Sequence, residues 1–268
     1  MKLFDSHAHY FDRRFFSDEN PKGVDALLCE DVFSGGVCGV INVGTNNDNN
    51  LVCIEQAARF DKMYAATGLH PEDVAYFKRD ISEEIKILAS LLDTKEKRKA
   101  AKIVALGEIG LDYHYDGFDK ELQQTYFDRQ MELATELDIP VIIHDRDAHG
   151  DCFETVLRYP RVRGVFHSYS GSAEMAKELV KRGWYISFSG VITFKNARKA
   201  VEVAEIVPID RILIETDCPY LAPHPYRGRL NHSGLMRYTA EKLAEIRGIS
   251  FDEVAEITLS NTKDLFSI

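Results

Sequence analysis

No apolar run in this 268-residue sequence approaches the roughly 18 residues that a membrane-spanning helix needs. The N-terminus also lacks the apolar stretch of a secretory signal, because Asp5, His7 and His9 interrupt it. These two absences predict a cytoplasmic protein with no membrane partner. Nothing in the sequence points to an obligate protein partner.

Cysteines and basic residues are also scarce. The five cysteines are odd in number and include no C-x-x-C pair, which argues against a disulfide framework or a thiolate zinc site and predicts reduced thiols. Lys and Arg number 33 against 43 Asp and Glu, so the formal net charge is -10. A chain of this charge repels polyanions at long range, which excludes binding through a wholly basic surface.

The sequence contains no Pro/Ser-rich linker, low-complexity tract or internal repeat, so a single domain over residues 1–268 is predicted. Short β-rich apolar runs alternate with longer segments of helical periodicity, a pattern typical of parallel strands joined by helical crossovers. Eight such runs lie at residues 2–5, 37–43, 63–68, 103–108, 140–143, 164–166, 184–188 and 211–215. Eight strands are the number in a TIM barrel, and the chain is close to the roughly 250 residues typical of that fold. The sequence therefore predicts an α/β protein with a (β/α)8 TIM-barrel fold.

Amphipathic segments between these runs include residues 50–60, 81–92, 120–138, 174–182 and 196–206, and two further helices are expected after His232. Ser250 is the predicted N-cap of the last helix, over residues 251–266. The one dense basic cluster, residues 95–99, contains Glu96 and follows Asp93. We interpret it as a solvated turn rather than a nucleic-acid-binding arm.

Six candidate metal ligands end or follow these runs. His7 and His9 follow the first run, where the two-residue period of a strand points both imidazoles the same way. The other four belong to the fourth, fifth, sixth and eighth runs: Glu108, His144, His167 and Asp217. Barrel strands converge at their carboxyl ends, so the six side chains are expected together. Each alone has a structural alternative, such as a helix-capping carboxylate, but four imidazoles and two carboxylates cannot share one pocket without a cation or costly desolvation.

Six ligands exceed one tetrahedral site, so the economical interpretation is two divalent metal ions that share a carboxylate. Glu108 is the predicted bridge, because its strand lies between those of the N-terminal histidines and those of His144 and His167. Imidazoles favour Zn or Mn and carboxylates accept Mg, so the choice among these metals stays open. Such a pair of ions activates water for hydrolysis and clamps the oxygens of an in-line displacement at phosphorus.

Polar residues in the loops around these ligands are candidates for substrate binding. They are His70, Asp112, Arg146, Arg227 and Arg229, with Ser168, Ser170 and His224 as weaker candidates. Their cations and hydroxyls suit phosphate oxygens and would give a local positive funnel inside an acidic protein. The alternative for each of them is ordinary loop polarity.

Six ordered blocks across nearly the whole chain resemble the TatD family of metal-dependent deoxyribonucleases, within the amidohydrolase-like barrels. The blocks read DSHAH at residues 5–9, GLHP at 68–71, GEIGLD at 107–112, PVIIH at 140–144, HSYSG at 167–171 and ETDCPYL at 215–221. The resemblance implies that the six candidate ligands bind the metals and that His70 and Asp112 lie close to the substrate. Two stretches depart from the family pattern. Ser168 stands in place of a Cys or similar small residue, and residues 229–233 read RLNHS where an RNEP stretch is common.

We therefore expect a metal-dependent hydrolase that cleaves phosphodiester bonds in DNA, an exonuclease on ends or single strands, through a metal-bound hydroxide. Asp217 is expected to orient that hydroxide and take its proton, and Glu108 and His70 complete the catalytic set. The acidic net charge argues against tight binding of a duplex. Two alternatives stay open: hydrolysis of an ester or amide, as by an aminoacyl-tRNA deacylase, and a non-catalytic scaffold that binds metal.

Overall fold

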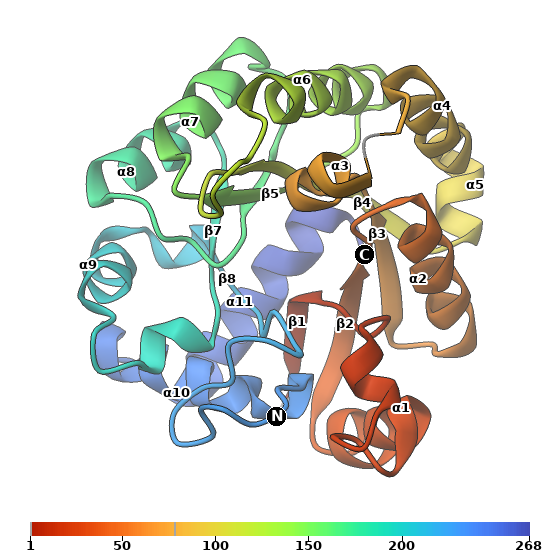
Figure 1. Cartoon of the computed structure of the whole chain (residues 1–268). Helices are drawn as coiled ribbons and strands as arrows, with labels where there is room; N and C mark the ends of the chain where they lie inside the picture. The colour runs from red at the N-terminus through yellow and green to blue at the C-terminus, as the bar shows by residue number, and fades with distance from the viewer. Residues whose placement is uncertain (1, 78) are drawn as a thin grey trace. The chain divides into compact units, whose positions relative to one another are not determined.

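The structure, a computed structural model, describes residues 2–77 and 79–268. Its eight strands form one parallel sheet in the order β1 to β8, which is the predicted (β/α)8 barrel (Figure 1). The strands are β1 (Leu3–Ala8), β2 (Val37–Val43), β3 (Met63–Thr67), β4 (Ile103–Asp112), β5 (Val141–Arg146), β6 (Gly164–Phe166), β7 (Tyr185–Phe188) and β8 (Ile212–Ile214). The chain divides into two compact units, one comprising the chain up to Asn42 with His167–Ile268 and the other Val43–Phe166.

The first unit contains the strands from both ends of the chain. β1 pairs with β2 and β7 pairs with β8, in parallel. Beyond β8, Cys218 forms a parallel bridge with Ala8 of β1, so the first and last strands are neighbours, as a barrel requires. The helices of this unit are η1 (Arg13–Phe16), α1 (Gly23–Ala26), η2 (Leu27–Phe33), α8 (Ala173–Lys181), η3 (Gly190–Thr193), α9 (Arg198–Ile206), η4 (Ile209–Arg211), η5 (Ser233–Leu235), α10 (Met236–Arg247) and α11 (Phe251–Phe266).

The second unit contains four strands that pair in chain order, because β3, β4, β5 and β6 form successive parallel ladders. Its helices are α2 (Asn47–Arg59), α3 (Pro71–Phe77), α4 (Ile81–Leu92), α5 (Lys95–Ala100), α6 (Lys120–Leu137) and α7 (His149–Arg158). The amphipathic segments predicted from the sequence therefore form helices in both units, with ends that shift by up to three residues.

The last helix shows why these segments pack as they do. Its buried residues recur at spacings of three and four, which gives α11 one buried stripe, and the helix packs against β1 and β8. Asn261 on the same stripe donates hydrogen bonds of 2.8 Å to the carbonyl oxygens of Ile209 and Ile212. These bonds satisfy buried backbone acceptors at the start of β8 and fix the helix against the strand.

Three strands extend beyond the apolar runs that identify them, namely β1, β4 and β5. The predicted fourth strand ends at Glu108, but β4 continues to Asp112 because residues after the apolar run still pair with β5. Gly110 makes this extension possible. Its φ is +143°, and a Cβ there would lie 2.0 Å from the carbonyl oxygen of His144. Asp112, rather than Glu108, therefore stands at the carboxyl end of β4.

The basic segment at residues 95–99 is a helix, so the prediction of a turn is wrong. Thr94 caps α5 by accepting a hydrogen bond from the backbone N–H of Lys97. The segment is largely exposed, as expected, and its charges serve local contacts: Lys97 pairs with Asp93, and Arg98 donates to the carbonyl oxygens of Leu92 and Leu137. These contacts support its interpretation as part of the scaffold.

None of the helices in the part of the chain that the structure describes is long and apolar enough to cross a membrane. All five cysteines are free, which agrees with the prediction of reduced thiols. Burial raises the pKa of the thiols of Cys53, Cys152 and Cys218 well above the usual value, so these three stay protonated and unreactive at neutral pH.

The start of α11 gives a first testable prediction. Ser250 forms the predicted N-cap, and together with Glu253 it makes a reciprocal capping box. Ser250→Ala should lower the free energy of unfolding by about 1 kcal/mol, because a backbone N–H at the helix start loses its acceptor. The measurement is urea denaturation of wild type, Ser250→Ala and the control Ser90→Ala, whose exposed hydroxyl bonds within its own helix. Equal stability of the two variants would contradict the capping role.

Candidate metal centre

In the first unit, three potential ligand atoms lie close together. His7 belongs to β1 and His9 follows it, and the strand period places their Nε2 atoms 3.0 Å apart. Asp217 follows β8, and its Oδ1 atom lies 3.3 Å from Nε2 of His9 and 3.7 Å from Nε2 of His7. All three side chains are largely shielded from solvent.

These separations fit a bound divalent cation. Nitrogen and oxygen ligands bind zinc at about 2.0–2.2 Å, so two ligand atoms of a tetrahedral site lie about 3.3 Å apart. The atoms of His7, His9 and Asp217 are 3.0–3.7 Å apart, on either side of that value. Burial raises the pKa of Asp217, but the hydrogen bond from His9 and the charges of the neighbouring histidines lower it below its usual value. The carboxylate is therefore ionised at neutral pH, as metal binding requires.

His167 belongs to the same set. It follows β6, and its ring stacks on that of His7 with 4.0 Å between the ring centroids. Its Nδ1 atom lies 3.2 Å from Oε1 of Glu215, which also accepts a hydrogen bond of 2.7 Å from the backbone N–H of Ser168. Metal-binding histidines generally donate a hydrogen bond from the N–H of their other ring nitrogen to such a group. The contact with Glu215 thus fixes the orientation of the His167 ring.

Sequence reasoning missed two fully buried carboxylates in this unit, Glu215 and Asp5. Oδ1 of Asp5 accepts hydrogen bonds from the backbone N–H groups of His7 and Thr216, and Oδ2 accepts one from the Thr216 hydroxyl. Burial raises the pKa of Asp5 to about 7, although the hydrogen bonds that it accepts oppose the shift. Asp5 thereby joins β1 to the segment that carries Asp217. The sequence signal that identifies both acids is their position: Asp5 precedes His7 by two residues, and Glu215 precedes Asp217 by two residues.

In the second unit, Glu108 of β4, His144 of β5 and His70 after β3 lie together. Oε1 of Glu108 is 2.8 Å from Nδ1 of His144 and 3.6 Å from Nε2 of His70. Nε2 of His144 lies 2.8 Å from Oδ2 of Asp112. Burial raises the pKa of Asp112, but the contact with His144 outweighs it and lowers the pKa below its usual value. His144 is therefore held between two carboxylates, and Asp112 is placed to orient its ring.

The tautomer of His70 decides between two roles. Nδ1 of His70 accepts a hydrogen bond of 3.1 Å from the backbone N–H of Glu72, so the neutral ring carries its proton on Nε2. A protonated Nε2 donates hydrogen bonds and has no lone pair for a metal. Although His70 lies close enough to Glu108 and His144 to complete a ligand triad, this bond favours its predicted role in substrate binding.

The three candidate arginines lie at the ends of strands or in the loop that follows. Arg146 ends β5, two residues after His144, and Nη1 donates to the Tyr115 hydroxyl at 3.3 Å. Arg227 and Arg229 follow β8 and are exposed, and the Cζ atom of Arg227 lies 3.7 Å from the centroid of the Phe194 ring. No carboxylate among the described residues pairs with either of these two arginines, so both guanidinium groups can accept an anion.

The structure thus brings His7, His9, His167 and Asp217 together in one unit. It brings five other candidates into a cluster in the second unit: Glu108, His144, His70, Asp112 and Arg146. Arg227 and Arg229 lie in the exposed loop after β8, outside this cluster. One centre with six ligands, two ions and Glu108 as the bridge stays a prediction, as does the single domain.

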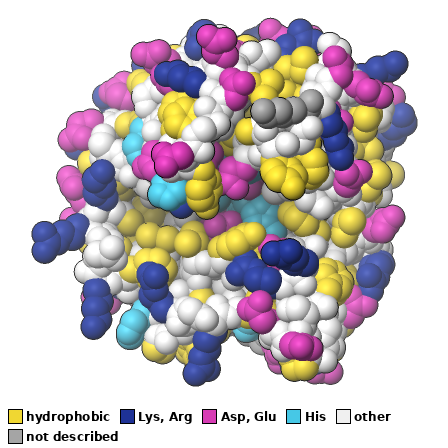
Figure 2. All heavy atoms as spheres, in the orientation of Figure 1, with side chains coloured by type: hydrophobic (Ala, Val, Ile, Leu, Met, Phe, Trp, Pro, Cys, Tyr) yellow, Lys and Arg dark blue, Asp and Glu magenta, His cyan; other side chains and the backbone are white. Residues whose placement is uncertain are grey.

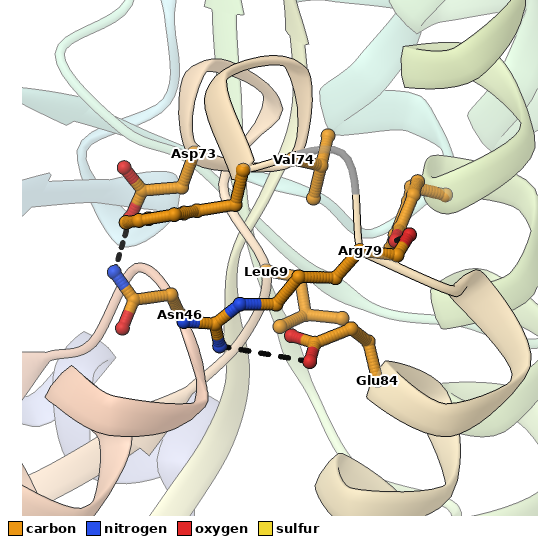
Figure 3. A pocket seen from close by; sticks show the side chains of 8 residues that line it. Asn46, Leu69, Asp73, Val74, Arg79 and Glu84 are labelled. Atoms are coloured by element: carbon orange, nitrogen blue, oxygen red, sulfur yellow. Dashed lines mark hydrogen bonds and ion pairs between the residues drawn. The ribbon is translucent and has the colours of Figure 1, made fainter.

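A pocket beside α3 and α4 contains none of the predicted site residues (Figure 3). Its polar side chains are paired with one another: Nδ2 of Asn46 donates to Oδ2 of Asp73 at 2.6 Å, and Nη1 of Arg79 lies 3.6 Å from Oε1 of Glu84. The enclosed space of about 10 Å³ has room for about one water molecule. This pocket is too small to be a substrate site.

The surface carries no broad basic area on the face drawn in Figure 2, where Lys and Arg side chains are interspersed with Asp and Glu. This distribution agrees with the formal net charge of -10. On this face, a polyanionic substrate would meet a few local cations rather than a general positive field.

Comparisons with known proteins relate the chain to one family. A family model described as TatD related DNase matches residues 4–267. The uncharacterized metal-dependent hydrolase YabD of Bacillus subtilis is 40% identical over 99% of this chain and 99% of its own. YcfH of Escherichia coli K12, also an uncharacterized metal-dependent hydrolase, is 36% identical over 100% and 97%. The crystal structure of the TatD homologue YjjV from Escherichia coli K12 superposes with a TM-score of 0.88 and 32% identity, covering 99% of this chain and 98% of its own.

The contact between His167 and Glu215 gives a second prediction. Glu215→Gln should weaken binding of Zn or Mn by about ten-fold to a hundred-fold, because the carboxylate that fixes the ring and raises its basicity is lost. The measurement is competition with a chelator of known affinity. Glu84→Gln is the matched control, since Glu84 is a buried glutamate that contacts Asn47 and none of the candidate ligands. Unchanged affinity in Glu215→Gln, or equal loss in both variants, would refute this role.

Proposed function

Because this chain belongs to the TatD family of metal-dependent hydrolases, we propose that it cleaves phosphodiester bonds in DNA, at exposed ends or in single strands. One observation carries the proposal: the ligand atoms of His7, His9 and Asp217 lie 3.0–3.7 Å apart, which suits a divalent cation. The description of the matching family model, TatD related DNase, supports DNA as the substrate.

The proposed ligands are the six residues predicted from the sequence, and Zn, Mn and Mg all suit them. They are His7, His9, His167 and Asp217 in the first unit and Glu108 and His144 in the second. Divalent cations, when bound, would supply activated water and neutralise charge on the phosphoryl oxygens.

The chain's own residues have separate tasks in this proposal. Asp217, ionised because of its histidine neighbours, would orient the attacking water and accept its proton. His70 would donate its Nε2–H to a phosphate oxygen, where negative charge increases in the transition state. Asp112 would keep the ring of His144 in place, and Arg146 would bind a neighbouring phosphate.

The roles of Glu108 and Asp112 are separable by metal content. Glu108→Ala should abolish hydrolysis of a single-stranded oligonucleotide and lower bound metal, because a ligand is lost. Asp112→Ala should retain most of its metal and turn over more slowly, because an orienting contact is lost. Metal analysis and initial rates of both purified variants provide the measurement. Equal metal loss in the two variants would contradict the assignment of Glu108 as a shared ligand.

Metal removal and a second substrate together test which bond the protein hydrolyses. Metal-stripped wild type should be inactive and regain oligonucleotide hydrolysis when Zn, Mn or Mg is added. A carboxyl ester assayed in parallel tests the other hydrolase class. If the protein turned over the ester after metal addition but left the oligonucleotide uncleaved, the nuclease proposal would be ruled out.

Salt dependence tests how an acidic protein holds DNA. If the metals and a few cations supply the contacts, few counterions are released and the salt slope corresponds to about 2 to 3 phosphates. Arg227→Ala should raise KM and flatten the slope by about one unit, with metal content unchanged. Arg237→Ala is the control, because Glu241 already pairs with that arginine. A steep wild-type slope, or no change in Arg227→Ala, would show that phosphate is held elsewhere.

A further inference from the structure

The loop between β4 and α6 carries three aromatic side chains that differ in their surroundings. The rings of Tyr113 and Phe118 stack on each other, with 4.6 Å between centroids and 12° between planes. The side chain of Tyr115 is 56% exposed, and its ring meets the ring of His114 edge-on at 5.1 Å. Tyr115 therefore presents aromatic surface to solvent, whereas its two neighbours cover each other.

Contacts with β5 hold this loop in place. The pairing of β4 with β5 ends with Asp112 opposite Arg146, and the backbone N–H of Tyr113 then donates to the Arg146 carbonyl oxygen at 2.9 Å. One residue further on, Nδ1 of His114 lies 2.8 Å from Oδ2 of Asp147. The loop therefore continues the ladder beyond the strand, which places Tyr115 beside Arg146.

The guanidinium of Arg146 lies over the Tyr115 ring and also bonds to its hydroxyl. Its Cζ atom lies 5.1 Å from the centroid of the Tyr115 ring, while Nη1 donates to the hydroxyl at 3.3 Å. Among residues 2–77 and 79–268, no carboxylate forms an ion pair with this guanidinium. The group thus keeps N–H donors for an anion, and the Tyr115 side chain stays 56% exposed.

This pair lies next to the ligand cluster of the second unit. Arg146 stands opposite Asp112 in the ladder, and Oδ2 of Asp112 is 2.8 Å from Nε2 of His144. His144 in turn contacts Glu108 at 2.8 Å. A short series of contacts therefore connects the exposed ring to the proposed metal ligands.

We propose that Tyr115 and Arg146 form the binding site for one unpaired nucleotide of the substrate: the base stacks on the Tyr115 ring and its phosphate binds Arg146. This inference rests on the proposed nuclease function and specifies its substrate as a strand with an unstacked base. Stacking on an aromatic ring accepts any base and releases no counterions, which suits a chain with a net charge of -10.

Two other exposed tyrosines, Tyr220 and Tyr76, differ from Tyr115 in their surroundings. The ring of Tyr220 is covered by Arg14, whose Cζ atom lies 4.1 Å from its centroid, and the Tyr220 hydroxyl donates to Asp12. Tyr76 on α3 is 81% exposed, and its ring meets Phe77 edge-on. No arginine is stacked on Tyr76 among the residues that the structure describes, which makes it a matched control for Tyr115.

The binding test uses full-length protein and single-stranded oligonucleotides with 2-aminopurine at the 3′ or the 5′ end and a phosphorothioate at the adjacent linkage to slow cleavage. Stacking quenches 2-aminopurine. Wild type, Tyr115→Phe and Tyr76→Ala should all quench one of the two probes. Tyr115→Ala should bind that probe about ten-fold or more weakly and leave it unquenched. Equal binding and quenching by wild type and Tyr115→Ala would overturn the proposal.

A kinetic test separates stacking from general damage to the site. For wild type, an oligonucleotide that lacks the terminal base should have a KM about ten-fold above that of the intact oligonucleotide. In Tyr115→Ala this ratio should fall to near one, mainly through the KM of the intact substrate. An unchanged ratio would refute stacking. If wild type quenches the probe but cleaves no phosphodiester, the nuclease proposal fails while the stacking site stands.

Discussion

The close approach of the His7 and His9 Nε2 atoms is the constraint on which the rest of the site depends. Two shielded imidazole nitrogens 3.0 Å apart, with the Asp217 carboxylate 3.3 Å from the nearer one, need a proton or a cation between them. The fold provides this arrangement in two ways. Strand alternation in β1 orients the histidines, and Asp5 binds the backbone of His7 and of Thr216, which precedes Asp217. The carboxylates that fix the scaffold are thus as much a part of the centre as its ligands.

Local patterns in the sequence predicted the eight strands and the start of α11 at Ser250, because apolar period and N-caps act within a few residues. The extension of β4 to Asp112 could not be predicted in that way, since it depends on pairing with β5 and not on burial of an apolar run. Glu215 was missed for a similar reason: its partner His167 is 48 residues away in the chain. The charged segment of α5 was misread because capping by Thr94 outweighs its lack of an apolar face.

The proposed recognition of DNA relies on local contacts rather than on a general positive field. An acidic chain gains nothing from long-range attraction of a polyanion, so the contacts that matter are short and specific. The extension of β4 has a second consequence in this respect, because it carries the following loop to Arg146. The extension of β4 therefore positions both Asp112, whose carboxylate contacts His144, and Tyr115, whose ring lies beside Arg146. In this proposal, metal ligation and substrate selection would be linked through β4 and β5.

Anomalous X-ray diffraction from crystals grown with Mn or Zn tests the central claim most directly. An anomalous peak is expected within about 2.0–2.2 Å of Nε2 of His7, Nε2 of His9 and a carboxylate oxygen of Asp217. Full occupancy of metal elsewhere in the protein, with no peak among these three side chains, would contradict this claim.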